Sequence, residues 1–182
     1  MIKNLTKASY CNSLVILACL TACYRIIDPP KDWRQILALK SLKEIISAQE
    51  YYRRMALGEN GQLEYWRRDI AGLHFVPYNG DAIRLISISI GLADKSPTLI
   101  PPSMSKDAKP QGGYWFEALP FEGEAKRKGS IFAVQATPDV SSPKGSITFI
   151  ADQGHIYKKD MQSIPVKMFP VDPIQDGWTL VR

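Results

Sequence analysis

The chain has 182 residues, of which 45% are hydrophobic and 23% charged, and its formal net charge is +5. This length and hydrophobic share allow one globular domain with a core of its own. The positive excess is mild, and no run of Lys and Arg interleaved with stacking aromatic residues occurs, so the sequence argues against a nucleic-acid partner.

The N-terminal segment has the order of a secretory signal, with basic residues first, then an apolar run, then small residues. Lys3 and Lys7 form the basic start, and residues 13–22 form the apolar run. A membrane-spanning helix needs about 20 apolar residues, which this run does not provide. We therefore predict a signal peptide at residues 1–22, with an uncleaved single anchor and a buried core helix as the alternatives.

The cysteine that follows this run is the expected point of attachment to the membrane. Leu20-Thr21-Ala22-Cys23 resembles a bacterial lipobox, which implies cleavage before Cys23 and lipidation of that residue. The residue after it is Tyr24 rather than Asp, and by resemblance to proteobacterial lipoproteins this mildly favours the outer membrane. All three cysteines lie at or before position 23, so the rest of the chain has no disulfide.

A tether and a long helix are expected after the lipidated cysteine. Pro29-Pro30 interrupts any helix, so residues 23–31 are predicted to form a tether and residues 32–182 to form one domain. Asp32 is the expected N-cap of an amphipathic helix from Trp33 to about Leu57. Its apolar face would hold Ile36, Leu39, Leu42, Ile45, Ile46, Tyr52 and Met55. Gly58 and Gly61 would end it.

The middle of the chain gives a mixed pattern. Residues 59–63 form a polar turn, and a short helix is expected from Tyr65 to Leu73. The segment from Ile83 to Leu92 fits a strand by alternation and a helix by the spacing of its first apolar residues, so its type stays open. Residues 96–113 contain four prolines and are expected to form an irregular loop.

The last third predicts an antiparallel meander. Short runs rich in aromatic and β-branched residues, separated by turn-forming stretches, are found at 114–119, 130–137, 146–151 and 155–158. One sheet face would hold Ile131, Ala133, Ile147 and Phe149, with the long helix covering it. The predicted fold is therefore α+β, with a long N-terminal helix packed on a small antiparallel meander.

Several short motifs, in this order, resemble type IV pilins and pseudopilins. Ala48-Gln49-Glu50-Tyr51-Tyr52 is similar to a pilin-like A-Q-x-x-Y stretch, and Gly113-Tyr114-Trp115-Phe116 to a G-Y-x-F strand. The hairpin at 148–160 and the tail at 172–178 resemble those of an uncharacterised family of bacterial envelope proteins with a pilin-like globular part. The resemblance implies a pilin-like head. The pilin processing site, Gly-Phe or Gly-Met followed by Glu, is missing here, so filament formation is not implied.

The polar residues suggest two kinds of chemistry, metal binding and hydrolysis. The turn after the long helix offers Glu59, Asn60 and Glu64 as weak metal ligands, but it lacks the alternating Asp pattern of a calcium loop, and a solvated turn is favoured. No metal or cofactor is expected. A hydrolase would use one of the two histidines, yet His74 is expected to be packed and His155 to be exposed at a hairpin turn.

Paired carboxylates for glycoside cleavage are a further alternative. Glu117, Glu122 and Glu124 are the acids considered, but Glu122 and Glu124 lie in a charged loop, and no second acid shares a predictable face with Glu117. The sequence therefore favours a protein without a catalytic role.

Aromatic residues near the helix end and the first strand are candidate partner contacts. Tyr65, Trp66 and Trp115 are the residues singled out, and a core role is the competing interpretation. Of the neighbours Tyr114 and Trp115, only one can point into the core from a strand.

Together these patterns predict a non-catalytic protein anchored to the bacterial cell envelope through a lipid on Cys23, facing the periplasm or the cell surface. It would act by binding or assembly, with an envelope protein or a polysaccharide as partner. The alternatives are a pseudopilin-like subunit of a secretion or pilus machine and a cell-wall hydrolase.

Overall fold

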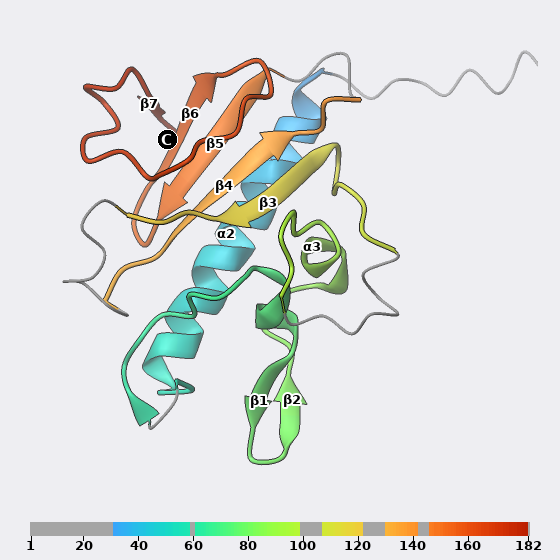
Figure 1. Cartoon of the computed structure of the whole chain (residues 1–182), viewed down its shortest axis with the longest axis vertical. Coiled ribbons are helices and arrows are strands. Elements are labelled where there is room, and N and C mark those ends of the chain that lie inside the picture. The colour runs from blue at the N-terminus through green and yellow to red at the C-terminus, as the bar shows by residue number, and fades with distance from the viewer. Residues whose placement is uncertain (1–30, 59–60, 99–106, 122–129, 142–145, 182) are drawn as a thin grey trace, which may run out of the picture. The chain divides into compact units, whose positions relative to one another are not determined.

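The computed structural model of the chain describes residues 31–58, 61–98, 107–121, 130–141 and 146–181 (Figure 1). Helix α2 (Lys31–Arg54) packs against an antiparallel sheet, in a pilin-like arrangement, and the predicted α+β class is confirmed. The predicted signal peptide, Cys23 and nearly all of the tether lie outside the described residues. Because α2 begins at Lys31, Asp32 lies inside the helix rather than at the predicted N-cap.

The sheet is a five-stranded meander in which each strand pairs with the next along the chain. Its strands are β3 (Tyr114–Ala118), β4 (Ala133–Pro138), β5 (Ile147–Asp152), β6 (Ile156–Asp160) and β7 (Thr179–Leu180). The first four match the prediction. The tight turn between β5 and β6 is held by the Asp152 carboxylate, which accepts the backbone N–H groups of Gly154 and His155. Strand β7 has two residues, too few to give a pattern in the sequence.

One stripe of α2 is buried against the sheet. Ala38, Leu42, Ile45, Ala48 and Tyr52 recur at helical spacing and are at most 6% exposed. Complete burial of a side chain such as Leu42 or Ile45 contributes about 1.5–3 kcal/mol.

The predicted apolar face of the helix was wrong at its two ends. Ile36 is 64% exposed and Met55 is 51% exposed. The core positions nearest to these ends are Ala38 and Tyr52 instead.

The face of β4 that meets the helix differs from the prediction by one residue. Phe132, Val134 and Ala136 join Phe149 in the main core, whereas Ala133 belongs to a second core on the opposite face. Side chains alternate along a strand, so a shift of one position exchanges the two faces. All six residues of β4 are buried, and hydrophobicity alone could not distinguish the faces.

The second core explains why β4 is buried on both faces. Its members are Leu119, Ala133, Ile150, Phe169 and Trp178. In Figure 1, α2 lies behind the sheet and the red segment between β6 and β7 crosses in front of it. The sheet is therefore enclosed between a helix and a long connection.

Residues 65–92 form short elements rather than the predicted helix. Residues 62–67 have no regular structure and are followed by a 3-10 turn, η2 (Ala71–His74). A hairpin of β1 (Val76–Tyr78) and β2 (Asp81–Ile83) comes next, then helix α3 (Ile88–Gly91).

The hairpin was not predicted, although its turn carries a recognisable signal. The turn is Asn79-Gly80, and both residues have positive φ, 52° and 91°. Asn-Gly is the dipeptide that such two-residue turns favour. The segment left open at 83–92 begins with the last residue of β2 and contains helix α3, so the alternating residues that favoured a strand lie partly in a helix.

The end of α2 has the hydrogen bonds of a Schellman cap. The N–H of Leu57 donates to the carbonyl of Tyr52 (3.2 Å), and the N–H of Ala56 donates to the carbonyl of Arg53 (3.1 Å). Ala56 occupies the left-handed position with φ 49°, where glycine is the usual residue. The chain therefore leaves the helix at Ala56, before the predicted stop at Gly58.

Replacing Ala56 by glycine is expected to stabilise the protein. Glycine removes the steric cost of the left-handed conformation, and we expect Ala56→Gly to raise the free energy of unfolding by about 0.5–1 kcal/mol. Urea unfolding measures the change. Ser47→Gly, at an exposed interior position of the same helix, is the control and should lower stability by about 0.5 kcal/mol. A loss of stability in both variants would contradict the assigned cap.

Candidate functional site

A groove lies where α2 ends, beside residues 61–68 and the first residues of β1. Its volume is about 590 Å³ and it is open to solvent on one side. This volume falls within the range of sites for small organic ligands. The groove is lined by Tyr52, Leu57, Gly58, Glu64, Tyr65, Trp66, Arg67, Arg68, Phe75 and Pro77.

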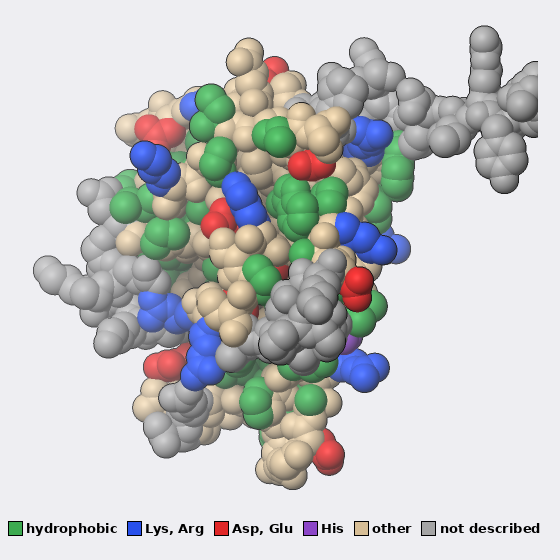
Figure 2. All heavy atoms as spheres, turned by 45° about the vertical axis from the view of Figure 1, so that its right-hand side comes forward, with side chains coloured by type: hydrophobic (Ala, Val, Ile, Leu, Met, Phe, Trp, Pro, Cys, Tyr) green, Lys and Arg blue, Asp and Glu red, His purple; other side chains and the backbone are tan. Residues whose placement is uncertain are grey.

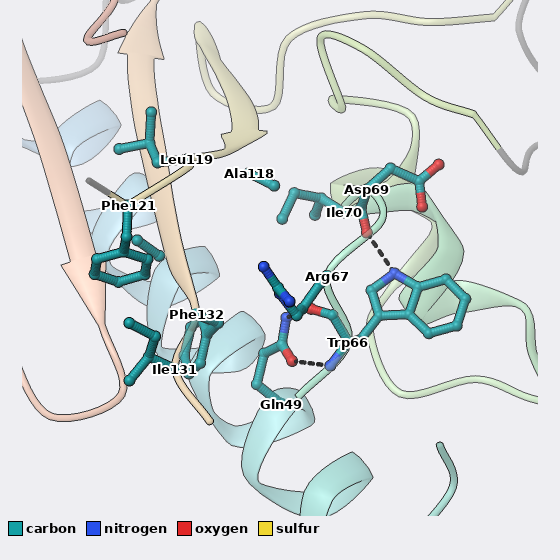
Figure 3. A pocket seen from close by; sticks show the side chains of 11 residues that line it. Gln49, Trp66, Arg67, Asp69, Ile70, Ala118, Leu119, Phe121, Ile131 and Phe132 are labelled. Atoms are coloured by element: carbon teal, nitrogen blue, oxygen red, sulfur yellow. Dashed lines mark hydrogen bonds between the residues drawn. The ribbon is translucent and has the colours of Figure 1, made fainter. Parts of the chain in front are cut away.

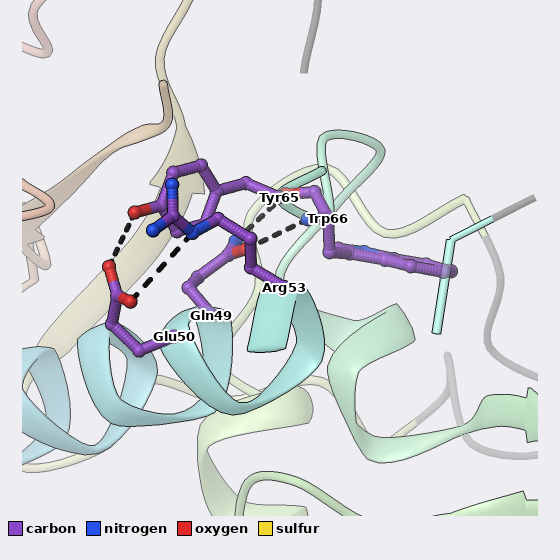
Figure 4. Close-up of polar contacts among 5 residues, drawn as sticks. All are labelled: Gln49, Glu50, Arg53, Tyr65 and Trp66. Atoms are coloured by element: carbon purple, nitrogen blue, oxygen red, sulfur yellow. Dashed lines mark hydrogen bonds and ion pairs between the residues drawn. The ribbon is translucent and has the colours of Figure 1, made fainter. Parts of the chain in front are cut away.

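The segment that forms one side of the groove is fastened to α2 by a buried amide (Figure 4). The Gln49 side chain donates from Nε2 to the carbonyl of Trp66 (2.8 Å), and its Oε1 accepts the N–H of Trp66 (2.9 Å). Gln49 is 3% exposed. It thereby satisfies both backbone polar groups of a residue that has no strand or helix partner of its own.

A second contact holds Tyr65 on the same helix (Figure 4). Its hydroxyl donates to the Glu50 carboxylate, and the Arg53 guanidinium lies 5.1 Å from the centre of its ring. Burial, together with the hydrogen bond to Glu50, raises the pKa of Tyr65 to about 12. The hydroxyl therefore remains a donor at every physiological pH.

The indole of Trp66 is held on several sides. Its Nε1–H donates to the carbonyl of Asp69 (2.7 Å), and its ring meets Tyr52 edge to face with centres 5.6 Å apart. The Arg68 guanidinium lies 5.6 Å from the indole centre. A Cβ on Gly72 would lie 2.3 Å from the indole, so only glycine fits behind it. The ring is thus fixed before any ligand arrives.

A much smaller cavity lies on the other side of the Trp66 segment, toward the sheet (Figure 3). Its volume is about 20 Å³, close to the space of a single water molecule. Figure 3 shows the Arg67 side chain directed toward this cavity and Phe132. Arg67 therefore lies between the two hollows, whereas Arg68 belongs to the groove alone.

Two buried aspartates fix the 3-10 turn behind Trp66. Asp69 accepts the N–H of Gly72 (3.0 Å) and the hydroxyl of Thr98 (2.8 Å), and Asp94 accepts the N–H groups of Ala71 (2.7 Å) and Ser96 (2.9 Å). Burial, assisted by the negative charge of Asp69, raises the pKa of Asp94 to about 6 against the opposing effect of its backbone donors. The turn is therefore sensitive to pH.

The surface around this end of the domain mixes apolar and basic groups. In Figure 2, hydrophobic side chains lie between Lys and Arg side chains on the lower half of the molecule, the end that carries β1 and β2 in Figure 1. The groove itself contains charges of both signs, from Glu64 and from the two arginines. Such a lining suits a ligand with apolar faces and polar edges.

The structure brings together two of the three predicted contact residues. Tyr65 and Trp66 line the groove but are only 5% and 8% exposed, so both also belong to the core. Trp115 is not among the lining residues and lies on β3, where its Nε1–H donates to Asp139 (3.2 Å). Tyr114 is buried beside it, which confirms the expected alternation.

The weak metal candidates do not form a described site. Glu64 lines the groove, and Glu59 and Asn60 lie outside the described residues. Among the residues that the structure describes, no group of three or more His, Cys, Asp or Glu side chains is placed to hold a metal ion.

The residues considered for catalysis are separated. His74 is buried, with its Nδ1 2.7 Å from the carbonyl of Ile86, and His155 is exposed after the β5–β6 turn, both as predicted. Glu117 accepts from the Gln135 amide (2.9 Å) and the Ser96 hydroxyl (3.1 Å). Glu122 and Glu124 lie outside the described residues.

No family model, curated protein or solved structure matches this chain. Across the described part of the chain, no helix has both the length and the apolar character needed to cross a membrane. The groove itself is therefore the basis for inferring a function.

Sequence reasoning missed the role of Gln49, although a signal for it was present. Ala48-Gln49-Glu50-Tyr51-Tyr52 is one of the motifs that resemble pilins, and Gln49 and Tyr52 in it contact Trp66. A glutamine on the buried stripe of a helix needs a polar partner, so its position indicates a buried hydrogen bond. Arg68 and Phe75 carried no comparable signal.

Removal of the Gln49 amide is expected to destabilise the protein. Gln49→Met keeps the length of the side chain but leaves the N–H and C=O of Trp66 buried without partners, at a cost of about 2–4 kcal/mol. Chemical denaturation of the variant gives the loss directly. Gln35→Met, at a partly exposed position of the same helix, should change stability by less than about 0.5 kcal/mol. Equal effects of the two changes would contradict the role of Gln49.

Stability should also depend on the protonation of Asp94. Its folded-state pKa of about 6 lies above the ordinary value of 3.8, so the folded state binds the proton more tightly. The stability from this proton is present below pH 3.8 and is lost as pH rises through about 6. We expect the stability difference between wild type and Asp94→Asn to fall by about 2 kcal/mol between pH 4.5 and 7.5. Unfolding curves that run parallel across this range would contradict the assignment.

Proposed function

We propose that the protein is a non-catalytic, lipid-anchored protein of the bacterial cell envelope that acts by binding, and that the groove at the end of α2 is its binding surface. The observation that carries the proposal is the groove of about 590 Å³, one side of which is held at Trp66 by two hydrogen bonds to Gln49 of α2. A site preorganised in this way does not lose binding energy to ordering its own side chains.

The groove lies at the C-terminal end of α2. The helix has 24 residues and is about 36 Å long at a rise of 1.5 Å per residue. The chain enters the domain at the first residue of this helix, and the groove is lined by residues of its last turn and the segment after it. Within the domain, the groove and the residue at which the chain enters therefore lie at opposite ends of α2.

The polar groups in the groove are suited to recognition. Arg68 offers a planar set of donors and Glu64 a pair of acceptors, and both lie beside aromatic side chains. His74, the buried histidine, is instead engaged with the carbonyl of Ile86. The groove therefore offers hydrogen-bonding partners and aromatic surface to a bound molecule.

A pseudopilin-like subunit of a secretion or pilus machine is the second candidate. The observation that favours it is the packing of one long N-terminal helix on an antiparallel meander, which is a pilin-like arrangement. Co-purification of the native protein with inner-membrane assembly components would support this role over that of a free-standing lipoprotein.

The lipid anchor is open to a direct test. In natively expressed protein, we expect the intact mass to show a chain that starts at Cys23 and carries lipid, and we expect it in the membrane fraction. Cys23→Ser should abolish the mass added by the lipid, because serine offers no thiol for lipid attachment. No lipid-modified protein should then be found. Cys19→Ser, which changes a neighbouring cysteine of the same segment, is the control. A wild-type mass of all 182 residues without lipid would contradict the anchor.

A further inference from the structure

We propose that the groove binds a β-1,4-linked chain of pyranose sugars, which stacks on the partly exposed ring of Phe75 and is hydrogen-bonded by Arg68 and Glu64. This inference rests on the proposed function, because it names the class of ligand for the same surface. It follows from the combination of residues in the groove rather than from any one of them.

The aromatic lining matches the apolar faces of such sugars. Tyr52 and Trp66 are only 6% and 8% exposed, so of the three aromatic residues that line the groove from different segments, Phe75 supplies the ring face for a sugar. In a β-1,4-linked glucose-type chain the hydroxyls are equatorial, so each ring presents flat C–H faces that pack on aromatic rings. Phe75 is partly exposed, and its ring is held edge to face by His74 at 4.7 Å. It is therefore the aromatic surface most available to a ligand.

The charged lining matches the edges of the same sugars. A hydroxyl group both donates and accepts hydrogen bonds, so it can engage an arginine and a carboxylate at once. Arg68 and Glu64 supply these two kinds of partner in one groove. Because their charges are opposite, the ligand needs no net charge of its own. The pairing thus favours a neutral polyhydroxylated chain over an anion.

The shape of the groove favours a chain over a small isolated molecule. Its volume of about 590 Å³ is open on one side, so a ligand can extend beyond it. A peptide that binds by adding a strand to β1 fits less well. Pro77 is the residue of β1 that borders the groove, and it has no N–H to donate to such a strand.

The test is an NMR titration of the full chain in detergent micelles with the β-1,4-linked hexamer of N-acetylglucosamine. The chain has four tryptophans, and their indole N–H signals report on separate places. We expect the signal of Trp66 to shift on binding, with those of Trp115 and Trp178 unchanged. The α-1,4-linked hexamer of glucose, whose rings do not form a flat ribbon, should bind at least about tenfold more weakly.

Variants then assign the contacts. Arg68→Gln should lower the association constant about tenfold by removing a charged donor. Phe75→Leu, which keeps an apolar side chain without an aromatic face, should lower it by a similar factor. Arg84→Gln is the matched control, because Arg84 is exposed and lies outside the groove lining, and its association constant should stay within twofold of wild type. Unchanged Trp115 and Trp178 signals in each free variant show that the fold is retained.

Several results would overturn the inference. These are no shift at Trp66 with the hexamer, equal binding of the two hexamers, equal effects of Arg68→Gln and Arg84→Gln, or shifts at Trp66 with a set of blocked decapeptides and not with sugar. None of them alters the mass and fractionation of the native protein. Shifts at Trp66 with the peptides alone would overturn the sugar ligand and keep the groove as a binding surface, whereas the absence of a shift with either would overturn both.

Discussion

The buried pairing between the Gln49 amide and the backbone of Trp66 is the interaction on which the site depends. Residues 62–67 have no regular secondary structure, so no ladder or helix satisfies their polar groups. Gln49 supplies one donor and one acceptor from the buried face of α2, at 2.8 and 2.9 Å. This bidentate contact sets the position of Trp66, and Trp66 in turn divides the groove from the small cavity against the sheet.

Two further constraints keep this arrangement in place. At one side, the Schellman cap at Ala56 turns the chain out of α2 and leaves Leu57 and Tyr52 in the groove lining. On the other side, Asp69 and Asp94 hold the turn that brings Gly72 against the indole. The groove is therefore built from a rigid helix end and a pinned turn. This arrangement requires burial of the Asp94 carboxylate, which raises its pKa.

Much of the fold could be predicted because its signals are local. Strands β3 to β6 are separated by turn-forming residues, and the helix carries apolar residues at helical spacing. The prediction was wrong where two interpretations were equally hydrophobic, as in β4, whose residues are all buried. It was also wrong at residues 65–73, where burial of Trp66 and the contact with Gln49 outweigh a modest helical pattern.

The sequence by itself determined the α+β class, the order of the long helix and strands β3 to β6, and the aromatic residues near the helix end. These follow from periodicity and turn residues, which act between neighbours in the chain. Only the tertiary structure decided that Tyr52, Glu64, Trp66, Arg68 and Phe75 share one groove. Their meeting depends on a contact between residues 17 positions apart, Gln49 and Trp66, and on the close approach of Gly72 to the indole. Such contacts are fixed by packing: a glutamine on the buried stripe of a helix signals a polar partner, but no local pattern identifies Trp66 as that partner.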